Sequence, residues 1–192
     1  MDKFMAAGQT PPLKKKISQI ITGIQDGIKM ASEFYPNLHA KFNQICLCPE
    51  TMGKHGQIGT VKEIIEICKS VRLQKTRPCI DFGHIFARNL GKKTGSSLYG
   101  PVFDILEAEL GHQVVEHLHI HYSIIEYTGK GEKKHHDNQN LEWGPSITPL
   151  FDLIEERCLT PIIINESPSL EPDAVLLMNQ WQQRQKMESG LK

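Results

Sequence analysis

Four residues of metal-ligand type stand at or near the ends of four short apolar runs. They are Glu50, Asp81, His119 and Glu166. Carboxylates crowded beside an imidazole are costly to bury unless a positive charge neutralises them, and a divalent metal ion does so most directly. Oxygen and nitrogen ligands suit Zn²⁺ or Mn²⁺. The four residues therefore predict a metal site if the fold brings the ends of these runs together.

Further candidate ligands follow the same runs. His84 stands three residues after Asp81, and His135 and His136 lie in a polar stretch after the third run. More ligands are present than one ion requires, and a site with two or more metal ions suits phosphodiester hydrolysis. A solvated turn explains His135 and His136 equally well from their spacing alone, and His117 is better explained as a hydrogen-bonded structural residue.

The elements that must position these residues alternate along the chain. Helical spacing of apolar residues predicts helices over 11–34, 60–71, 97–110, 149–158 and 171–187. Short apolar, β-rich runs predict strands over 44–50, 77–82, 114–122 and 161–166. This alternation predicts an α/β fold with a parallel sheet, in which residues at the carboxyl ends of the strands meet at one rim. Strand alternation also places His119 and His121 on the same face.

Composition limits the class of protein. The chain has 192 residues, with 22 Lys+Arg against 22 Asp+Glu, nine His and five Cys. Zero formal charge argues against attachment to DNA or a membrane by bulk charge, although local basic loops remain possible. No apolar run approaches the roughly 20 residues of a membrane span, and the first ten residues lack the apolar stretch of a secretory signal. We expect a cytoplasmic protein with no membrane partner, whose cysteines are buried reduced thiols without metal-type spacing.

A series of motifs resembles the endonuclease IV family of apurinic/apyrimidinic endonucleases, especially its shorter archaeal-type members. The motifs are Pro49–Lys54, Cys79–His84 with Ala87-Arg88, His119–Ser123, Glu126-Tyr127, Gly131–His135 and Asn165–Pro168. The resemblance runs from about Pro11 to the last helix. It implies a xylose isomerase-like TIM barrel that is incomplete and contains about the four C-terminal βα units. We expect one partial domain over 1–192, with residues 1–12 disordered.

The resemblance implies zinc as the cofactor, with two or three ions in the family. Glu50 matches the carboxylate that bridges two metals, and Asp81, His119 and Glu166 match the remaining protein ligands of one zinc. One complete site is therefore expected here, and Mn²⁺ is the alternative ion.

The resemblance implies a further zinc that this sequence matches less well. His84 matches one of its ligands, and His135 matches the loop histidine that shares the ion, with His136 as the adjacent alternative. Members of the family have an aspartate two residues before that histidine, where this chain has Lys133. The ion then loses a ligand or recruits a neighbour, and the candidates are Glu132 and Asp137.

The implied reaction is hydrolysis on the 5′ side of an abasic site in double-stranded DNA. Glu50 and Glu166 are the expected catalytic residues, and Glu166 is expected to orient the nucleophile. Residues near strand ends are expected to contact the substrate, and these are Arg88, His121, Lys133 and Lys134. Ordinary loop solubility explains the basic residues among them nearly as well.

Two alternative functions fit the same residues. The carboxylate and histidine set also suits the single-metal site of a sugar isomerase or epimerase of the same barrel superfamily. A truncated, non-catalytic metal-binding relative is the other alternative, because the family takes two zinc-binding histidines from front-half strands that this sequence lacks. About 250 residues are typical of the barrel, so we expect a fragment or a late-started gene model. Open sheet edges make self-association a further possibility.

Overall fold

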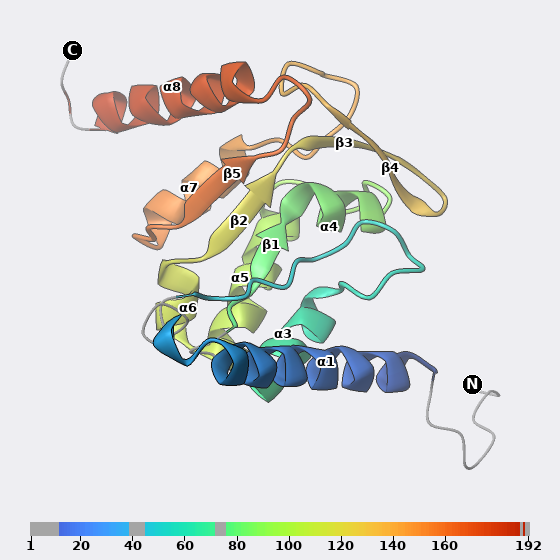
Figure 1. The fold of residues 1–192 in the computed structure, drawn as a ribbon. Coiled ribbons are helices and arrows are strands. Elements are labelled where there is room, and N and C mark those ends of the chain that lie inside the picture. The colour runs from blue at the N-terminus through green and yellow to red at the C-terminus, as the bar shows by residue number, and fades with distance from the viewer. Residues whose placement is uncertain (1–11, 39–44, 72–75, 189, 191–192) are drawn as a thin grey trace.

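A parallel sheet of three short strands lies at the centre of the molecule (Figure 1). β1 (Cys79–Asp81), β2 (His119–Tyr122) and β5 (Ile162–Asn165) lie in the order β1-β2-β5. The structure is a computed structural model that describes residues 12–38, 45–71, 76–188 and 190. The α/β class and the parallel sheet expected from the sequence are confirmed.

All five helices expected from the apolar spacing are present, within one or two residues of their predicted ends. The helical elements are α1 (Pro12–Phe34), η1 (Pro36–Leu38), α3 (Val61–Val71), α4 (Phe82–Arg88), α5 (Ser96–Leu110), α6 (His112–Glu116), α7 (Thr148–Glu156) and α8 (Glu171–Glu188). Among them, α4 and α6 are short helices that the apolar spacing did not predict. The expected disordered segment 1–12 lies outside the described residues except for Pro12, which begins α1.

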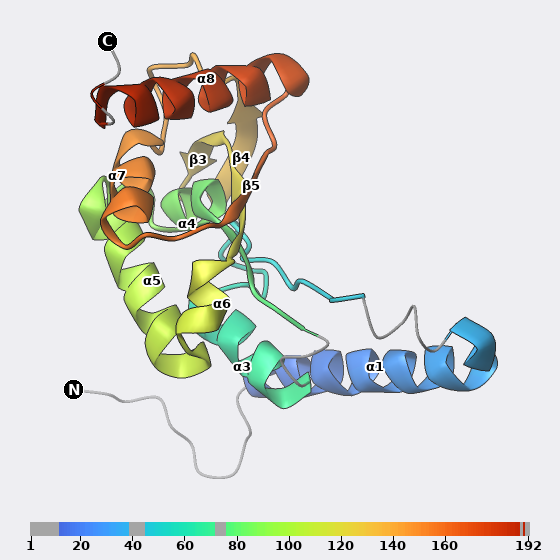
Figure 2. The same ribbon diagram turned by 90° about the vertical axis from the view of Figure 1, so that its left-hand side faces the viewer.

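The two faces of the sheet differ in chemistry. Ile80 and Ile120 are fully buried in the main core, which lies on the side of the sheet that α5 and α7 cover (Figures 1 and 2). Since side chains alternate along a strand, Asp81 and His121 project from the opposite face. The register pairs these two residues directly across β1 and β2. The sheet therefore separates an apolar, helix-covered face from a face that carries titratable side chains.

The described sheet does not close on itself. In the described chain, β5 pairs only with β2, and Ile162 and Ile164 on the titratable face are 62% and 42% exposed. At the other edge, Leu47 and Glu50 form isolated parallel bridges to the segment that leads into and begins β1. The expected strand over 44–50 is thus reduced to these bridges, and its first residue lies outside the described chain. Three strands and a bridged segment form an open arc.

The third expected strand begins later than predicted. Residues 114–116 belong to α6, and β2 starts only at His119. The apolar pair Val114 and Val115 suits either a strand or a helix, and a short apolar run does not distinguish the two. The second expected strand ends at Asp81, one residue earlier than predicted. The Asp81 Oδ1 accepts a hydrogen bond from the backbone N–H of His84 (2.6 Å) and so caps α4, which begins immediately after β1.

A β-hairpin replaces the polar loop expected after β2. β3 (Ile124–Thr128) and β4 (Gly131–His136) pair antiparallel, and Gly129-Lys130 forms the two-residue connection. The run of β-branched and aromatic residues in 124–128 followed by glycine is a hairpin signal that the polar character of β4 obscured. This hairpin lies beyond the carboxyl ends of the sheet strands (Figure 1).

The loop between Glu50 and α3 is fastened by a capping box. The Thr60 Oγ1 accepts from the N–H of Glu63, while Glu63 Oε2 accepts from the N–H groups of Gly59 and Thr60, both at 2.8 Å. Gly59 in turn accepts a backbone hydrogen bond from Met52. The cap therefore stabilises both α3 and the loop that begins at the rim.

Replacing Glu63 with glutamine is expected to lower the free energy of unfolding at neutral pH by about 1 kcal/mol. Although burial alone would raise the pKa of Glu63, the hydrogen bonds from Gly59 and Thr60 lower it. This contribution is present above the ordinary glutamate pKa and is lost as the pH falls through the depressed value. Urea unfolding should show the difference at pH 7 and a smaller one in acid. Glu66→Gln, on the exposed face of α3, is the control.

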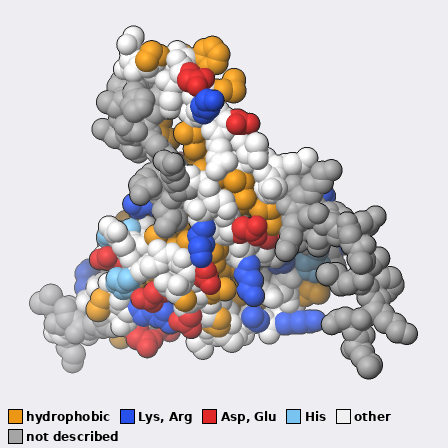
Figure 3. Space-filling model, turned by 90° about the horizontal axis from the view of Figure 1, so that it is seen from below, with side chains coloured by type: hydrophobic (Ala, Val, Ile, Leu, Met, Phe, Trp, Pro, Cys, Tyr) orange, Lys and Arg blue, Asp and Glu red, His pale blue; other side chains and the backbone are white. Residues whose placement is uncertain are grey.

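The surface that includes α1 carries no dominant charge. In the view of Figure 3, acidic and basic side chains are intermingled. The inner side of α1 packs on α3 through a small apolar cluster that contains Ile17, Ile64 and Cys68. Among the described residues, no helix is both long enough and apolar enough to cross a membrane.

Candidate metal centre

Four side chains meet where the sheet strands end. Glu50, Asp81, His121 and Glu166 bring their ligand atoms within 4.8 Å of one another, and we call this group the carboxylate cluster. Asp81 ends β1, Glu166 follows β5 directly, and Glu50 bridges to β1 from the upstream segment. The predicted meeting of these three carboxylates at one rim is therefore what the structure shows.

Several atoms of the carboxylate cluster lack hydrogen-bond partners. His121 Nδ1 lies 3.1 Å from Glu166 Oε1 and 3.4 Å from Glu50 Oε1. Despite these short separations, Glu50 Oε1, Asp81 Oδ2 and His121 Nδ1 are buried and make no hydrogen bond. Buried polar atoms normally have partners. Three of them converging on one point fits a bound cation that satisfies all three.

The cluster perturbs the acidities of its members in opposite directions. Burial alone would raise the pKa of Glu50, but contacts with His121 and His84 lower it to about 2. Burial raises the pKa of Asp81, which is fully enclosed. The pKa of His121 is raised by its contact with Glu50, against the effect of burial. The carboxylates thus favour the positively charged form of the imidazole, as they would favour any cation placed among them.

The structure brings His121 rather than His119 into the carboxylate cluster. Both histidines project from the same face of β2, as predicted, but His121 lies two residues closer to the carboxyl end. His119 pairs across the sheet with Cys79, two residues before the pair formed by Asp81 and His121. The sequence predicts His119 as a ligand beside the carboxylates and His121 as a substrate contact. In the structure His121 lies beside the carboxylates, and His119 lies two residues further from the rim.

A second group of ligand type lies beside the first. His84, Glu132 and His135 bring their ligand atoms within 4.8 Å of one another, and we call this group the His84 cluster. The Nδ1–H of His84 donates to the Thr51 carbonyl oxygen at 2.8 Å, so its Nε2 points to Glu132 at 3.5 Å. A histidine whose Nδ1 is held by a carbonyl oxygen presents Nε2 to a metal.

His135 is oriented in the same way. Its Nδ1 lies 2.9 Å from Ser123 Oγ and 3.2 Å from the backbone oxygen of Glu166, which leaves Nε2 directed to Glu132 at 3.9 Å. Of the two replacements considered for the family's missing aspartate, Glu132 lies in the cluster. Asp137 instead accepts a hydrogen bond from Ser169.

A β-bulge explains why Glu132 and His135 share a face. Three residues apart on a regular strand, they would project to opposite sides. The hairpin register shifts between Glu126 and Tyr127, since these pair with Lys134 and Glu132 and leave Lys133 as the extra residue. The extra residue restores Glu132 and His135 to one side.

The remaining predicted site residues have other partners. His136 Nε2 lies 3.1 Å from Glu126 Oε2, and Lys133 also pairs with Glu126, so both lie away from the His84 cluster. The guanidinium of Arg88 donates to the carbonyl oxygens of Met52, Lys54 and Gln57. These hydrogen bonds hold the rim loop against α4. Lys134 is exposed beside His135.

The donor sets of both clusters suit divalent metal ions. Glu50, Asp81, His121 and Glu166 would hold one ion, and His84, Glu132 and His135 a second. His84 connects the two, because its Nδ1 lies 3.2 Å from Glu50 Oε1 while its Nε2 faces Glu132. Burial alone would lower the pKa of His84, but contacts with Glu50 and the charge of Asp81 raise it to about 9. An ion at Nε2 would therefore displace a proton.

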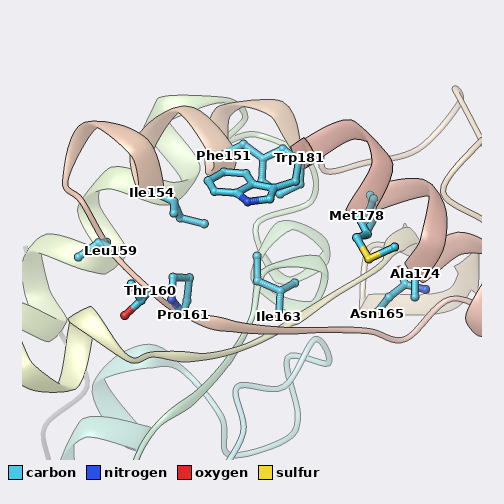
Figure 4. Close-up of a pocket in the computed structure, with 11 residues that line it drawn as sticks. Phe151, Ile154, Leu159, Thr160, Pro161, Ile163, Asn165, Ala174, Met178 and Trp181 are labelled. Carbon is cyan, nitrogen blue, oxygen red and sulfur yellow. The ribbon is translucent and has the colours of Figure 1, made fainter. Parts of the chain in front are cut away.

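An apolar pocket of about 440 Å³ lies between α7, β5 and α8 (Figure 4). Phe151, Ile163 and Trp181 are among its lining residues. Asn165 reaches it from the helix-covered side of the sheet, opposite the side chain of Glu166. The pocket contains no titratable side chain and is separate from both clusters.

Comparisons with known proteins give the following matches. Residues 17–187 match the family described as xylose isomerase-like TIM barrel. An uncharacterized protein of Methanocaldococcus jannaschii is 35% identical over 136 residues, which cover 70% of the chain and 47% of that protein. The chain thus spans about half the length of this curated relative. No solved structure matches the chain.

Proposed function

The chain belongs to the xylose isomerase-like TIM-barrel family, and from this premise we propose that it is a zinc-dependent endonuclease that acts at abasic sites in DNA. The open arc of parallel strands, with helices on one face, corresponds to an incomplete barrel of this family. The proposed reaction is hydrolysis of a phosphodiester bond, of the kind catalysed by the endonuclease IV group.

The observation that carries this proposal is the pair of adjacent clusters linked by His84. A sugar isomerase of the same superfamily needs the carboxylate cluster alone. The His84 cluster adds a second set of ligands, with His84 on α4 and with Glu132 and His135 on the β3–β4 hairpin. Hydrogen bonds to Thr51 and Ser123 orient His84 and His135. Paired metal sites favour displacement at phosphorus, where attacking and leaving oxygens both need stabilisation.

We assign different roles in the reaction to the side chains of the carboxylate cluster. Bound zinc supplies Lewis acidity toward the phosphate and lowers the pKa of water. Glu50 contacts both His84 and His121 and positions one cluster against the other. The side chain of Glu166 is 35% exposed, more than that of Glu50, so we assign it to accept a proton from the attacking water and orient it. An abasic nucleotide leaves the base stack at low cost and can reach this rim.

The test uses the 192-residue chain, which is loaded with zinc and incubated with a DNA duplex that contains one abasic site. We expect cleavage of the damaged strand, no cleavage of an undamaged duplex and loss of activity after chelation. His135→Asn should abolish cleavage while the carboxylate cluster keeps its zinc. Zinc bound in both clusters without any cleavage would overturn the proposal and favour a non-catalytic relative.

A single-metal sugar isomerase or epimerase is the second candidate function. The observation that favours it is that the carboxylate cluster contains four ligands without help from the hairpin. Such an enzyme should interconvert ketoses and aldoses with one metal per chain. It should also keep its activity in His135→Asn, which distinguishes it from the nuclease.

Two exposed lysines of the hairpin that carries Glu132 and His135 are proposed to contact the DNA backbone. Lys130 lies in the hairpin turn, and Lys134 immediately precedes His135. The double variant Lys130→Ala/Lys134→Ala is expected to weaken binding to abasic duplex and to reduce the slope of log K against log salt by about 2. Fluorescence anisotropy at several salt concentrations measures both. The double variant Lys16→Ala/Lys29→Ala, on α1, should leave the slope unchanged.

A further inference from the structure

A third group of ligand type lies one pleat below Asp81 and His121 of the carboxylate cluster. Cys79 and His119 are direct neighbours across β1 and β2, in the same way that Asp81 and His121 are neighbours above them. The Sγ of Cys79 and ring nitrogens of His119 and His121 all lie within 4.8 Å of one another. Neither Cys79 nor His119 has a place in the proposed hydrolysis.

The geometry of the two imidazoles matches a tetrahedral metal site. His119 Nε2 and His121 Nε2 are 3.2 Å apart, and the rings meet at 64°. Zinc-to-nitrogen bonds of about 2.0 to 2.1 Å at the tetrahedral angle separate two nitrogen ligands by about 3.3 to 3.4 Å. The two rings thus need little movement to bind one ion, and Cys79, which is buried, approaches the same point.

The donor chemistry differs from that of the carboxylate cluster. A thiolate with two imidazoles selects thiophilic transition metals, whereas three carboxylates with one imidazole accept harder ions. We propose that Cys79, His119 and His121 form a separate thiolate–imidazole site for a thiophilic transition-metal ion, with zinc as its expected occupant. Three protein ligands leave the fourth tetrahedral position for water or another exogenous ligand.

The two sites share His121 and therefore compete for it. His121 presents Nδ1 to the carboxylates and Nε2 to His119. A neutral imidazole has one nitrogen available to a metal at a time. An ion in the thiolate–imidazole site draws this ligand away from the carboxylate cluster, so its occupancy opposes that of the cluster above.

Cobalt binding tests the proposal independently of catalysis. The reduced, metal-free chain is titrated with Co²⁺, and we expect the near-ultraviolet charge-transfer absorption of a cobalt–thiolate bond. The band should be lost in Cys79→Ser and kept in Cys158→Ser, whose thiol is exposed. Absence of the band in the unmodified chain, or an unchanged band in Cys79→Ser, would overturn the proposal.

Two further variants complete the test. His119→Asn tests the site if Cys79→Ser does not fold, and Glu166→Gln distinguishes the site from the proposed nuclease function. His119→Asn changes a half-buried residue and should remove or greatly weaken the band while circular dichroism stays unchanged. Glu166→Gln weakens the competing cluster, so the band should appear at no higher cobalt concentration while abasic cleavage falls. If the zinc-loaded protein cleaves abasic DNA but the metal-free protein shows no thiolate band with Co²⁺, this site is refuted and the nuclease proposal stands. If the band appears but the zinc-loaded protein does not cleave, the nuclease proposal is refuted and this site stands.

Discussion

Replacing Glu50 with glutamine should reduce cleavage of abasic DNA by more than about 100-fold and remove zinc from the carboxylate cluster. Replacing a residue that hydrogen-bonds a metal ligand typically lowers metal affinity or activity by about 10- to 100-fold. We propose that Glu50 is itself a ligand, so the expected loss is larger. Its Oε1 is the atom that faces both His84 and His121, at 3.2 and 3.4 Å. An amide in its place carries no negative charge and can direct N–H groups at the metal position.

Single-turnover cleavage and measurement of bound zinc by atomic emission test this expectation. The substitution preserves side-chain shape, and the bridge from Glu50 to Cys79 is formed by backbone, so circular dichroism should not change. Glu142→Gln, in an exposed loop, is the matched control. Full zinc content and an undiminished rate in Glu50→Gln would show that this carboxylate is not a ligand.

The places of the residues at strand ends were predictable from two regularities, the alternation of helices and strands along the chain and the alternation of side chains along each strand. Alternation of helices and strands makes the sheet parallel, and a parallel sheet places all carboxyl ends on one rim. Glu50, Asp81 and Glu166 each stand at such an end, so their meeting follows from the order of elements without knowledge of side-chain contacts. The helix-covered face was predictable for the same reason, since Ile80 and Ile120 alternate with the ligand positions.

The depth of a residue along its strand was harder to predict. His119 and His121 share a face, and the sequence alone does not say which one is level with Asp81. The register of β1 against β2 decides it, and that register depends on packing between elements distant in the chain. This register places His121, two residues after the predicted ligand His119, level with Asp81.

Irregular backbone accounts for the other differences. The bulge at Lys133 brings Glu132 beside His135, which regular strand alternation does not predict. His136, the next residue, projects to the other face and contacts Glu126. Arg88 was expected to contact substrate because it is a cation near a strand end. In the structure its guanidinium donates to three backbone carbonyl oxygens, and the sequence does not predict these contacts because they depend on how the rim loop folds.

Gly53 allows the rim loop to approach the His84 cluster, and Gly53→Ala is the second substitution with a large expected effect. A Cβ at this position would lie 2.6 Å from Glu132 Cβ, 2.9 Å from Glu132 Oε2 and 3.2 Å from the His84 ring. The backbone N–H of Glu132 also donates to the Gly53 carbonyl oxygen at 3.2 Å, so loop and hairpin cannot separate without losing this bond. The added methyl group must therefore displace Glu132.

The expected result of Gly53→Ala is loss of one bound zinc per chain and a fall in abasic cleavage of about 10- to 100-fold. The overpacked contact should also lower the free energy of unfolding by about 1 to 3 kcal/mol. The carboxylate cluster should keep its ion, because none of its members is among the three nearest contacts of the new methyl group. Gly56→Ala is a close control, since a Cβ there meets nothing within 4 Å in the same loop. Unchanged zinc stoichiometry in Gly53→Ala, beside unchanged cleavage, would mean that Glu132 does not bind a metal and that the His84 cluster is a hydrogen-bonded structural contact.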